Sequence, residues 1–286
     1  MIDKRRIDIW DEQEKIYGLI PYPKSLGEWF IMAHKIKKIS RGLIEIGLNQ
    51  EIIKEYHSLI TNEINAGAKD ICFSKTLGLM NNLLPYSMQV KEHITKDKLI
   101  TFAFTIFNYM YELDQIIGYL NNFNKIILSK GISQPQTISG KILEITPIPD
   151  LEIKVHTFSL NAKQILIEVL NCIKYVCQID KCNYSTLPSL LPSVSTLSKQ
   201  ILLSKDNILF LWNLRNIFEH PKEDYFCKIN NFYFDQGKII NPNWIIVNGK
   251  NTIKEDNLVD RLNYFYDFLL NFTESIFHII VNEAKV

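Results

Sequence analysis

The most informative segment of the chain runs from Ser198 to Pro221 and reads SKQILLSKDNILFLWNLRNIFEHP. Its apolar residues have the spacing of an amphipathic α-helix, and they are Ile201, Leu202, Ile208, Leu211, Trp212, Leu214 and Phe218. Proline disfavours the helical conformation in the residue before it, so Pro221 predicts that the helix ends at His220. The segment therefore predicts one long helix with a histidine at its end.

Four polar residues stand near the end of this predicted helix: Arg215, Asn216, Glu219 and His220. At the helical advance per residue, Glu219 lies ~40° around the axis from Arg215. Asn216 lies ~100° and His220 ~140° from the same residue. The four side chains therefore share one side of an otherwise apolar helix. They offer a cation, an amide, a carboxylate and an imidazole, and the helix dipole favours cations at this end.

The order of these residues resembles the R-N-x-x-x-H motif of ribonucleases of the HEPN superfamily. Arg215, Asn216 and His220 match that motif position by position, and the resemblance covers Leu160 to Glu283 at most. It implies a helical bundle, a homodimer that brings two motifs together, and metal-independent cleavage of RNA. It also implies a setting in defence, stress or a toxin system, with an antitoxin or regulatory protein as a further partner.

The chemistry of RNA cleavage fits each matched residue. His220 would be the general base or acid, because histidine can take the proton of a 2′-hydroxyl near neutral pH. Arg215 would stabilise the phosphate, since a fixed guanidinium can bind two of its oxygens. Asn216 would orient the imidazole or donate to phosphate, and Glu219 would support Arg215 or tune the imidazole. A symmetric dimer would supply the second histidine that acid and base catalysis together require.

The same residues admit other interpretations. Arg215 and Glu219 are an i, i+4 pair, which is often a simple helix-surface salt bridge, and Asn216 and His220 can cap the helix end. A non-catalytic HEPN-like helical module would bind RNA, a nucleotide or a protein partner. An unrelated helical protein would carry the motif by coincidence.

The remainder of the chain predicts a mainly α fold, a helical bundle with a small β-hairpin inserted before the last helix. Further helices are predicted at 25–48, 49–65, 69–84, 95–129, 160–179 and 256–283. Prolines and glycines at 131–157 predict a linker or packed loop between an N-terminal helical region, 1–130, and a HEPN-like domain, 158–286. Apolar residues alternate at about 226–248, which predicts the hairpin with Gly237 in its turn.

A second candidate RNA contact lies near the N-terminus. His34, Lys38 and Arg41 fall on one helical stripe, and Lys35 and Lys37 flank it. Such a stripe can bind an RNA backbone, although a run of charge is more often a solvated face. The stripe is therefore either an RNA contact or a solvent-exposed charged face.

Composition and charge exclude several classes of protein. The 286 residues include 32 Lys and Arg and 31 Asp and Glu, a formal charge of +1, which excludes a strongly basic protein that coats nucleic acid. No apolar run approaches the ~20 residues of a membrane span, so we expect no membrane partner. The charged N-terminus lacks the apolar core of a secretory signal, which predicts a cytoplasmic protein.

Cysteine spacing and short motifs bear on metals and cofactors. The five cysteines, without a secretory signal, predict free thiols. Cys172, Cys177 and Cys182 recur every five residues, which is not the spacing of a zinc site. The sequence also lacks G-x-x-x-x-G-K and G-x-G-x-x-G, so we expect neither a metal nor a cofactor.

Overall fold

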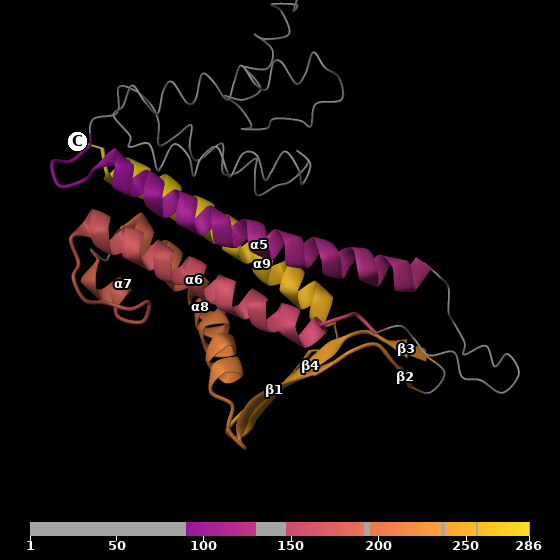
Figure 1. The fold of residues 1–286 in the computed structure, drawn as a ribbon. Helices are drawn as coiled ribbons and strands as arrows, with labels where there is room; N and C mark the ends of the chain where they lie inside the picture. The colour runs from indigo at the N-terminus through magenta and orange to yellow at the C-terminus, as the bar shows by residue number, and fades with distance from the viewer. Residues whose placement is uncertain (1–89, 130–146, 192–194, 236–237, 256, 286) are drawn as a thin grey trace, which may run out of the picture. The chain divides into compact units, whose positions relative to one another are not determined.

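The computed structural model describes residues 90–129, 147–191, 195–235, 238–255 and 257–285 (Figure 1). Within these ranges the chain is mainly α-helical and carries a small antiparallel sheet, as the sequence predicted. The three helices predicted before residue 85 lie outside the described residues, and so does the stripe of His34, Lys35, Lys37, Lys38 and Arg41.

The helices of the described residues are α5 (Lys96–Ser129), α6 (Leu151–Cys177), the short α7 (Leu187–Leu190), α8 (Thr196–Glu219) and α9 (Leu258–Glu283). The predicted bounds of α5, α8 and α9 differ from these by at most two residues. Local signals explain the agreement. At the start of α9, for example, the Oδ1 of Asn257 accepts a hydrogen bond of 3.2 Å from the backbone N–H of Asp260, which is an N-cap.

Helix α6 begins earlier than the sequence predicted. Leu151 and Phe158 are both buried, and their separation places them on one face of the helix. Pro149 stands just before the helix, where proline is tolerated, so it marks a helix start and not a longer loop. The predicted loop conformation is therefore wrong for 151–157, whereas 130–146 lies outside the described residues.

The described residues form two compact units, each assembled from segments far apart in the sequence. The first unit contains the described parts of Met1–Asn108, Ile167–Leu203 and Asn271–Val286. The second contains the described parts of Tyr109–Leu166 and Ser204–Leu270. Each of α5, α6, α8 and α9 is therefore divided between the two units. The motif residues and the hairpin all belong to the second unit.

In the first unit, the chain that enters α5 is tied to α6 and to the end of α9. The hydroxyl of Tyr175 accepts a hydrogen bond of 2.8 Å from the backbone N–H of Thr95 and donates one of 3.1 Å to the carbonyl of His93. The backbone N–H of Lys91 donates to the carbonyl of Ala284 at 3.0 Å. These bonds satisfy backbone groups that precede the first turn of α5.

In the second unit, side-chain hydrogen bonds hold α5 against both α6 and α9. The amides of Asn121 and Asn263 exchange two hydrogen bonds of 2.8 Å, and α5 and α9 lie side by side in Figure 1. The amide of Asn161 donates to the Oε2 of Glu112 at 2.7 Å. The apolar core between the helices includes Leu113, Ile117, Val155, Phe158, Ile165, Ile208, Leu211, Leu214, Ile217, Leu262 and Phe265.

The antiparallel sheet follows α8 in the chain. Its strands are β1 (Tyr225–Asn230), β2 (Tyr233–Asp235), β3 (Lys238–Ile240), β4 (Asn243–Asn248) and β5 (Asn251–Glu255). One register runs from Tyr225 opposite Asn248 to Asp235 opposite Lys238, so β1–β2 and β3–β4 form one long hairpin. The predicted hairpin is therefore confirmed, although Gly237 lies outside the described residues. Strand β5, which the sequence analysis did not predict, pairs with β4.

Two side chains anchor the hairpin to the helices. Trp244 in β4 is fully buried, and its ring lies 6.1 Å from that of Phe210 in α8. The side chain of Asn231 accepts a hydrogen bond of 2.9 Å from the N–H of Ile148 and donates one of 2.8 Å to its carbonyl. These contacts hold the hairpin against α8 and against the segment that leads into α6.

Candidate functional site

The end of α8 lies within one residue of the position that Pro221 predicted. The helix ends at Glu219, and the backbone N–H of His220 still donates to the carbonyl of Asn216 at 2.9 Å. That bond fixes the backbone of His220 one helical turn beyond Asn216, so both side chains project from the same face. The imidazole is exposed, and the amide is half-buried.

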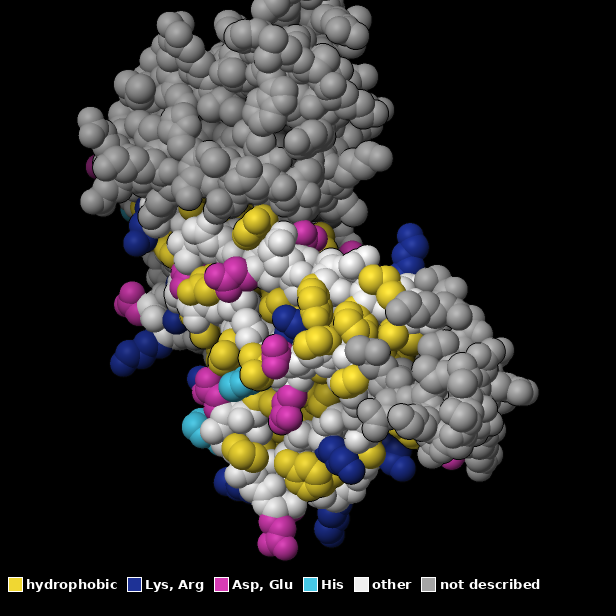
Figure 2. Space-filling view, turned by 45° about the vertical axis from the view of Figure 1, so that its right-hand side comes forward, with side chains coloured by type: hydrophobic (Ala, Val, Ile, Leu, Met, Phe, Trp, Pro, Cys, Tyr) yellow, Lys and Arg dark blue, Asp and Glu magenta, His cyan; other side chains and the backbone are white. Residues whose placement is uncertain are grey.

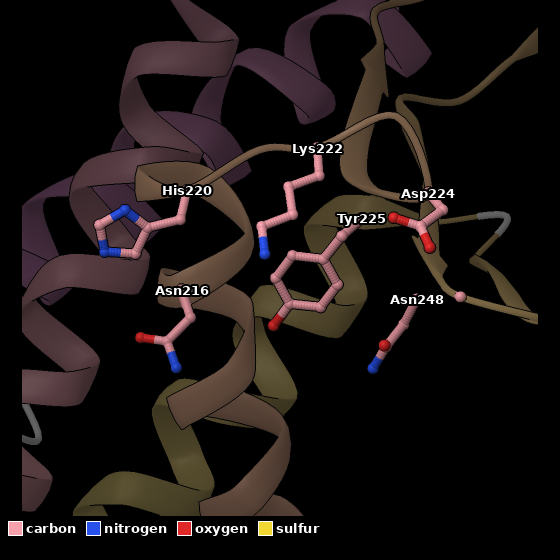
Figure 3. Close-up of a pocket in the computed structure, with 7 residues that line it drawn as sticks. Asn216, His220, Lys222, Asp224, Tyr225 and Asn248 are labelled. Atoms are coloured by element: carbon pink, nitrogen blue, oxygen red, sulfur yellow. The ribbon is translucent and has the colours of Figure 1, made fainter.

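An open cavity of about 530 Å³ lies at this end of the helix (Figure 3). Asn216 lies in the last turn of α8 and His220 directly follows that helix. The following turn and the start of β1 contribute Lys222, Asp224 and Tyr225, and the end of β4 and the turn after it contribute Asn248 and Gly249. Its volume falls in the range of ~300–1,000 Å³ that is usual for small-ligand sites. The predicted motif therefore borders a concave surface that joins the helix to the sheet.

Backbone hydrogen bonds shape the wall of this cavity. Lys222 and Tyr225 exchange two of them, at 2.8 and 3.0 Å, so the chain turns tightly between the end of α8 and β1. The N–H of Gly249 donates to the carbonyl of Asp224 at 2.7 Å. Gly249 has a φ of 59°, which favours glycine at this position in the β4–β5 turn. The wall is thus held by the main chain and not by side chains alone.

Arg215 and Glu219 lie beside the cavity and not in its lining. The Nη2 of Arg215 and the Oε2 of Glu219 form an ion pair, and their side chains are 26% and 25% exposed. The structure therefore divides the predicted site residues into two groups: Asn216 and His220 line the cavity, whereas Arg215 and Glu219 pair with each other.

A lysine that the sequence analysis did not single out contacts the motif. The Nζ of Lys163 in α6 donates a hydrogen bond of 2.9 Å to the Oδ1 of Asn216 and lies 4.7 Å from the ring centroid of Trp212. Burial lowers the pKa of Lys163, the guanidinium of Arg215 lowers it further, and the carboxylate of Glu219 opposes both effects. Lys163 therefore joins the two groups of motif residues.

Lys163 also determines how the amide of Asn216 is turned. A lysine ammonium can only donate, so the amide oxygen faces Lys163 and the NH₂ group faces elsewhere. In Figure 3 the amide nitrogen of Asn216 lies on the side of the Tyr225 ring. The cavity is thereby given a hydrogen-bond donor, which suits an anion or a carbonyl oxygen. Sequence spacing could not reveal this contact, because Lys163 belongs to another helix.

His156 is the second histidine close to the motif helix, but it does not line the cavity. Its ring stacks on Phe218 with a centroid distance of 5.3 Å and an interplanar angle of 30°. The Nε2 atom of His156 is buried and has no hydrogen-bond partner. This histidine therefore packs against α8 and leaves His220 as the imidazole that the cavity presents.

Charge on the visible surface is mixed. In the described part of the face shown in Figure 2, acidic and basic side chains are interspersed with exposed hydrophobic ones. An RNA on this face would meet individual cations and not a broad basic area. Among the described residues, no three His, Cys, Asp or Glu side chains are grouped so that they could hold a metal ion. No described helix is long and apolar enough to cross a membrane.

No family model, curated protein or solved structure matches this chain. The function is therefore inferred from the residues and the geometry of the cavity.

Proposed function

We propose that this protein is a metal-independent endoribonuclease of the HEPN type. The observation that carries the proposal is the position of Asn216 and His220, which line one open cavity at the end of α8, next to the cation Lys222. A histidine, an amide donor and a lysine around a concave surface match the needs of RNA transesterification.

His220 is the proton-transfer group in this proposal. It takes the proton of a 2′-hydroxyl as that oxygen attacks the adjacent phosphorus, or it protonates the 5′-oxygen that leaves. The products are a 2′,3′-cyclic phosphate and a free 5′-hydroxyl. The imidazole is exposed at the rim of the cavity, so a phosphodiester can reach it without a change in the fold.

The negative charge of the transition state requires donors close to the phosphate. The amide of Asn216, which Lys163 turns away from itself, is one donor, and the ammonium of Lys222 is a second. Arg215 is the third in this proposal, because a guanidinium has five N–H groups and its pairing with Glu219 does not use them all. Glu219 supports Arg215 by fixing its direction.

A homodimer completes the proposed site. The cavity of one chain presents one histidine from its lining residues, whereas efficient transfer uses a base and an acid on opposite sides of the phosphate. Two copies related by a twofold axis would place two such histidines across one groove. We propose RNA as the substrate, defence, stress or a toxin system as the setting, and an antitoxin or regulatory protein as a further partner.

The test is cleavage of end-labelled RNA in EDTA by the wild-type protein and by Arg215→Ala and His220→Ala. We expect wild-type cleavage that leaves a 2′,3′-cyclic phosphate, and loss of activity in both variants. His278→Ala is the matched control, because His278 is another exposed histidine in the described residues and does not line the cavity. Equal activity of His220→Ala and the wild type would contradict the assignment of His220.

A second candidate function is a non-catalytic HEPN-like module that binds RNA, a nucleotide or a protein partner. The ion pair between Arg215 and Glu219 favours it, because a guanidinium engaged by a carboxylate is a weaker phosphate ligand. This alternative predicts a folded dimer that cleaves no RNA in a broad panel. A folded monomer that cleaves no RNA would instead make the motif a coincidence at a helix end.

A further inference from the structure

The side of the cavity away from His220 has a different chemistry from the side that carries the motif. In Figure 3, His220 and Asp224 lie on opposite sides, and Tyr225 lies between them. The imidazole of His220 and the amide of Asn216 line one side, next to the single lining cation, Lys222. The carboxylate of Asp224 and the amide of Asn248 line the other. A carboxylate repels phosphate and accepts hydrogen bonds, so the two sides suit different parts of one ligand.

Strand pairing places Tyr225 and Asn248 next to each other. They are direct cross-strand partners in the β1–β4 pair, so their side chains leave the sheet on the same face. The ring of Tyr225 is half-buried, and its hydroxyl donates a long hydrogen bond of 3.5 Å to the carbonyl of Asn213. Its backbone is held by the reciprocal pair with Lys222. The ring is therefore a fixed aromatic surface with an amide beside it.

We propose that Tyr225, Asn248 and Asp224 form a binding subsite for one unpaired nucleobase of single-stranded RNA. The base stacks on the ring of Tyr225, which is the usual way in which proteins hold unpaired bases. The amide of Asn248 meets the edge of the base, and Asp224 accepts a hydrogen bond from an exocyclic amino group. The base subsite deepens the proposed function, on which it rests for the placement of the scissile phosphate near His220.

The proposal predicts which bases the subsite prefers. Asp224 can only accept hydrogen bonds, so it favours bases that carry an amino group. Cytosine and uracil have rings of the same size, and cytosine carries an amino group where uracil carries a carbonyl oxygen. Comparing these two bases separates the effect of Asp224 from the effect of stacking area.

The experiment measures binding without cleavage. Fluorescein-labelled 2′-fluoro oligocytidine and oligouridine lack the 2′-hydroxyl, so they cannot be cut, and their affinities for the full-length protein are read by fluorescence anisotropy. We expect Tyr225→Leu to weaken both affinities about tenfold, the loss of roughly one stacking contact. Tyr225→Phe keeps the ring, so it should bind both probes as tightly as the wild type does. Tyr233→Leu is the matched control, because Tyr233 is an exposed tyrosine of the same hairpin that does not line the cavity.

Two exposed residues provide variants that should not disturb the fold. Asp224→Asn should remove most of the preference for oligocytidine over oligouridine, and Asn248→Ala should weaken binding of both probes. Affinities of Tyr225→Leu and Asn248→Ala within twofold of the wild type would overturn the proposed subsite. An equal loss in Tyr225→Phe and Tyr225→Leu would also overturn it, because stacking needs only the ring.

The outcomes separate this proposal from the proposed ribonuclease activity. If Tyr225→Leu loses binding while neither the wild type nor any variant cleaves RNA, the subsite stands and the ribonuclease proposal fails. If His220→Ala loses cleavage while Tyr225→Leu and Asn248→Ala bind the probes normally, the ribonuclease proposal stands and the subsite fails.

Discussion

Lys163 and Asn216 are 53 positions apart in the sequence, and the Nζ of Lys163 donates a hydrogen bond of 2.9 Å to the Oδ1 of Asn216. This contact joins α6 to the last turn of α8. It turns the NH₂ group of Asn216 away from Lys163, and it places a cation next to Arg215 and Glu219. Lys163 is therefore a positioning residue in the proposed site, although no motif contains it.

Lys163→Met should lower the kcat/KM for RNA cleavage. The loss should be about tenfold, the effect of removing one hydrogen bond from a charged donor. Lys163→Arg keeps a charged donor and should retain much of the activity. The control is Lys154→Met, because Lys154 belongs to the same helix and lies over the ring of Tyr119 at 4.2 Å, away from the cavity lining. Equal losses in the Lys154 and Lys163 variants would refute a specific role for Lys163.

The Arg215–Glu219 pair should contribute little to stability. Each side chain is about a quarter exposed, and such i, i+4 pairs typically contribute ~0.3–0.5 kcal/mol. A double-mutant cycle with Arg215→Gln, Glu219→Gln and the double variant measures the coupling through urea unfolding. A coupling free energy above ~2 kcal/mol would show that the pair is mainly structural and would favour the non-catalytic alternative.

Trp244 should make a large contribution to the stability of the second unit. Its ring is fully buried, so Trp244→Ala should lower the free energy of unfolding by ~3–5 kcal/mol. Trp244→Phe should lower the free energy of unfolding much less. It keeps an aromatic ring and removes the Nε1 donor, which is buried without a hydrogen-bond partner and is therefore unfavourable. Urea unfolding followed by circular dichroism tests both values. A phenylalanine variant as unstable as the alanine variant would mean that the Nε1 group finds a partner.

Cys227 should make stability fall at alkaline pH. Burial raises the pKa of its thiol from 9.0 to about 12, and the nearby Glu152 carboxylate contributes less. Between these values the unfolded chain has lost a proton that the folded chain keeps, so the free energy of unfolding falls as pH rises. Cys227 alone can contribute at most ~1.4 kcal/mol per pH unit to this slope. Cys227→Ala should flatten the decline between pH 9 and about 10.5, and an unchanged slope would contradict the prediction.

Local features of the chain could be read from the sequence. The bounds of α8 follow from its apolar spacing and from Pro221, and both act within a few residues. The β1–β4 hairpin follows from alternating apolar residues, such as Trp244 and Ile246, which are both buried. The start of α6 was missed because Pro149 signals a break equally well before a loop and before a helix.

The arrangement of the candidate site was only partly predictable. Helical geometry alone places Asn216 and His220 one turn apart on one face, and both line the cavity. The same geometry brings Arg215 next to Glu219, but it cannot show that they pair with each other beside the cavity. Whether two neighbouring charges face each other or a ligand depends on the surrounding surface.

The mainly helical class, the end of α8 before Pro221 and the hairpin that follows could be predicted from the sequence alone. These depend on interactions between residues close in the chain, whose periodicity and turn signals are local. The contact between Lys163 and Asn216, and the cavity that Tyr225 and Asn248 share with His220, depend instead on tertiary packing. Such contacts form when buried side chains such as Trp244 determine how distant segments pack against each other. The spacing of residues within one segment carries no information about that packing.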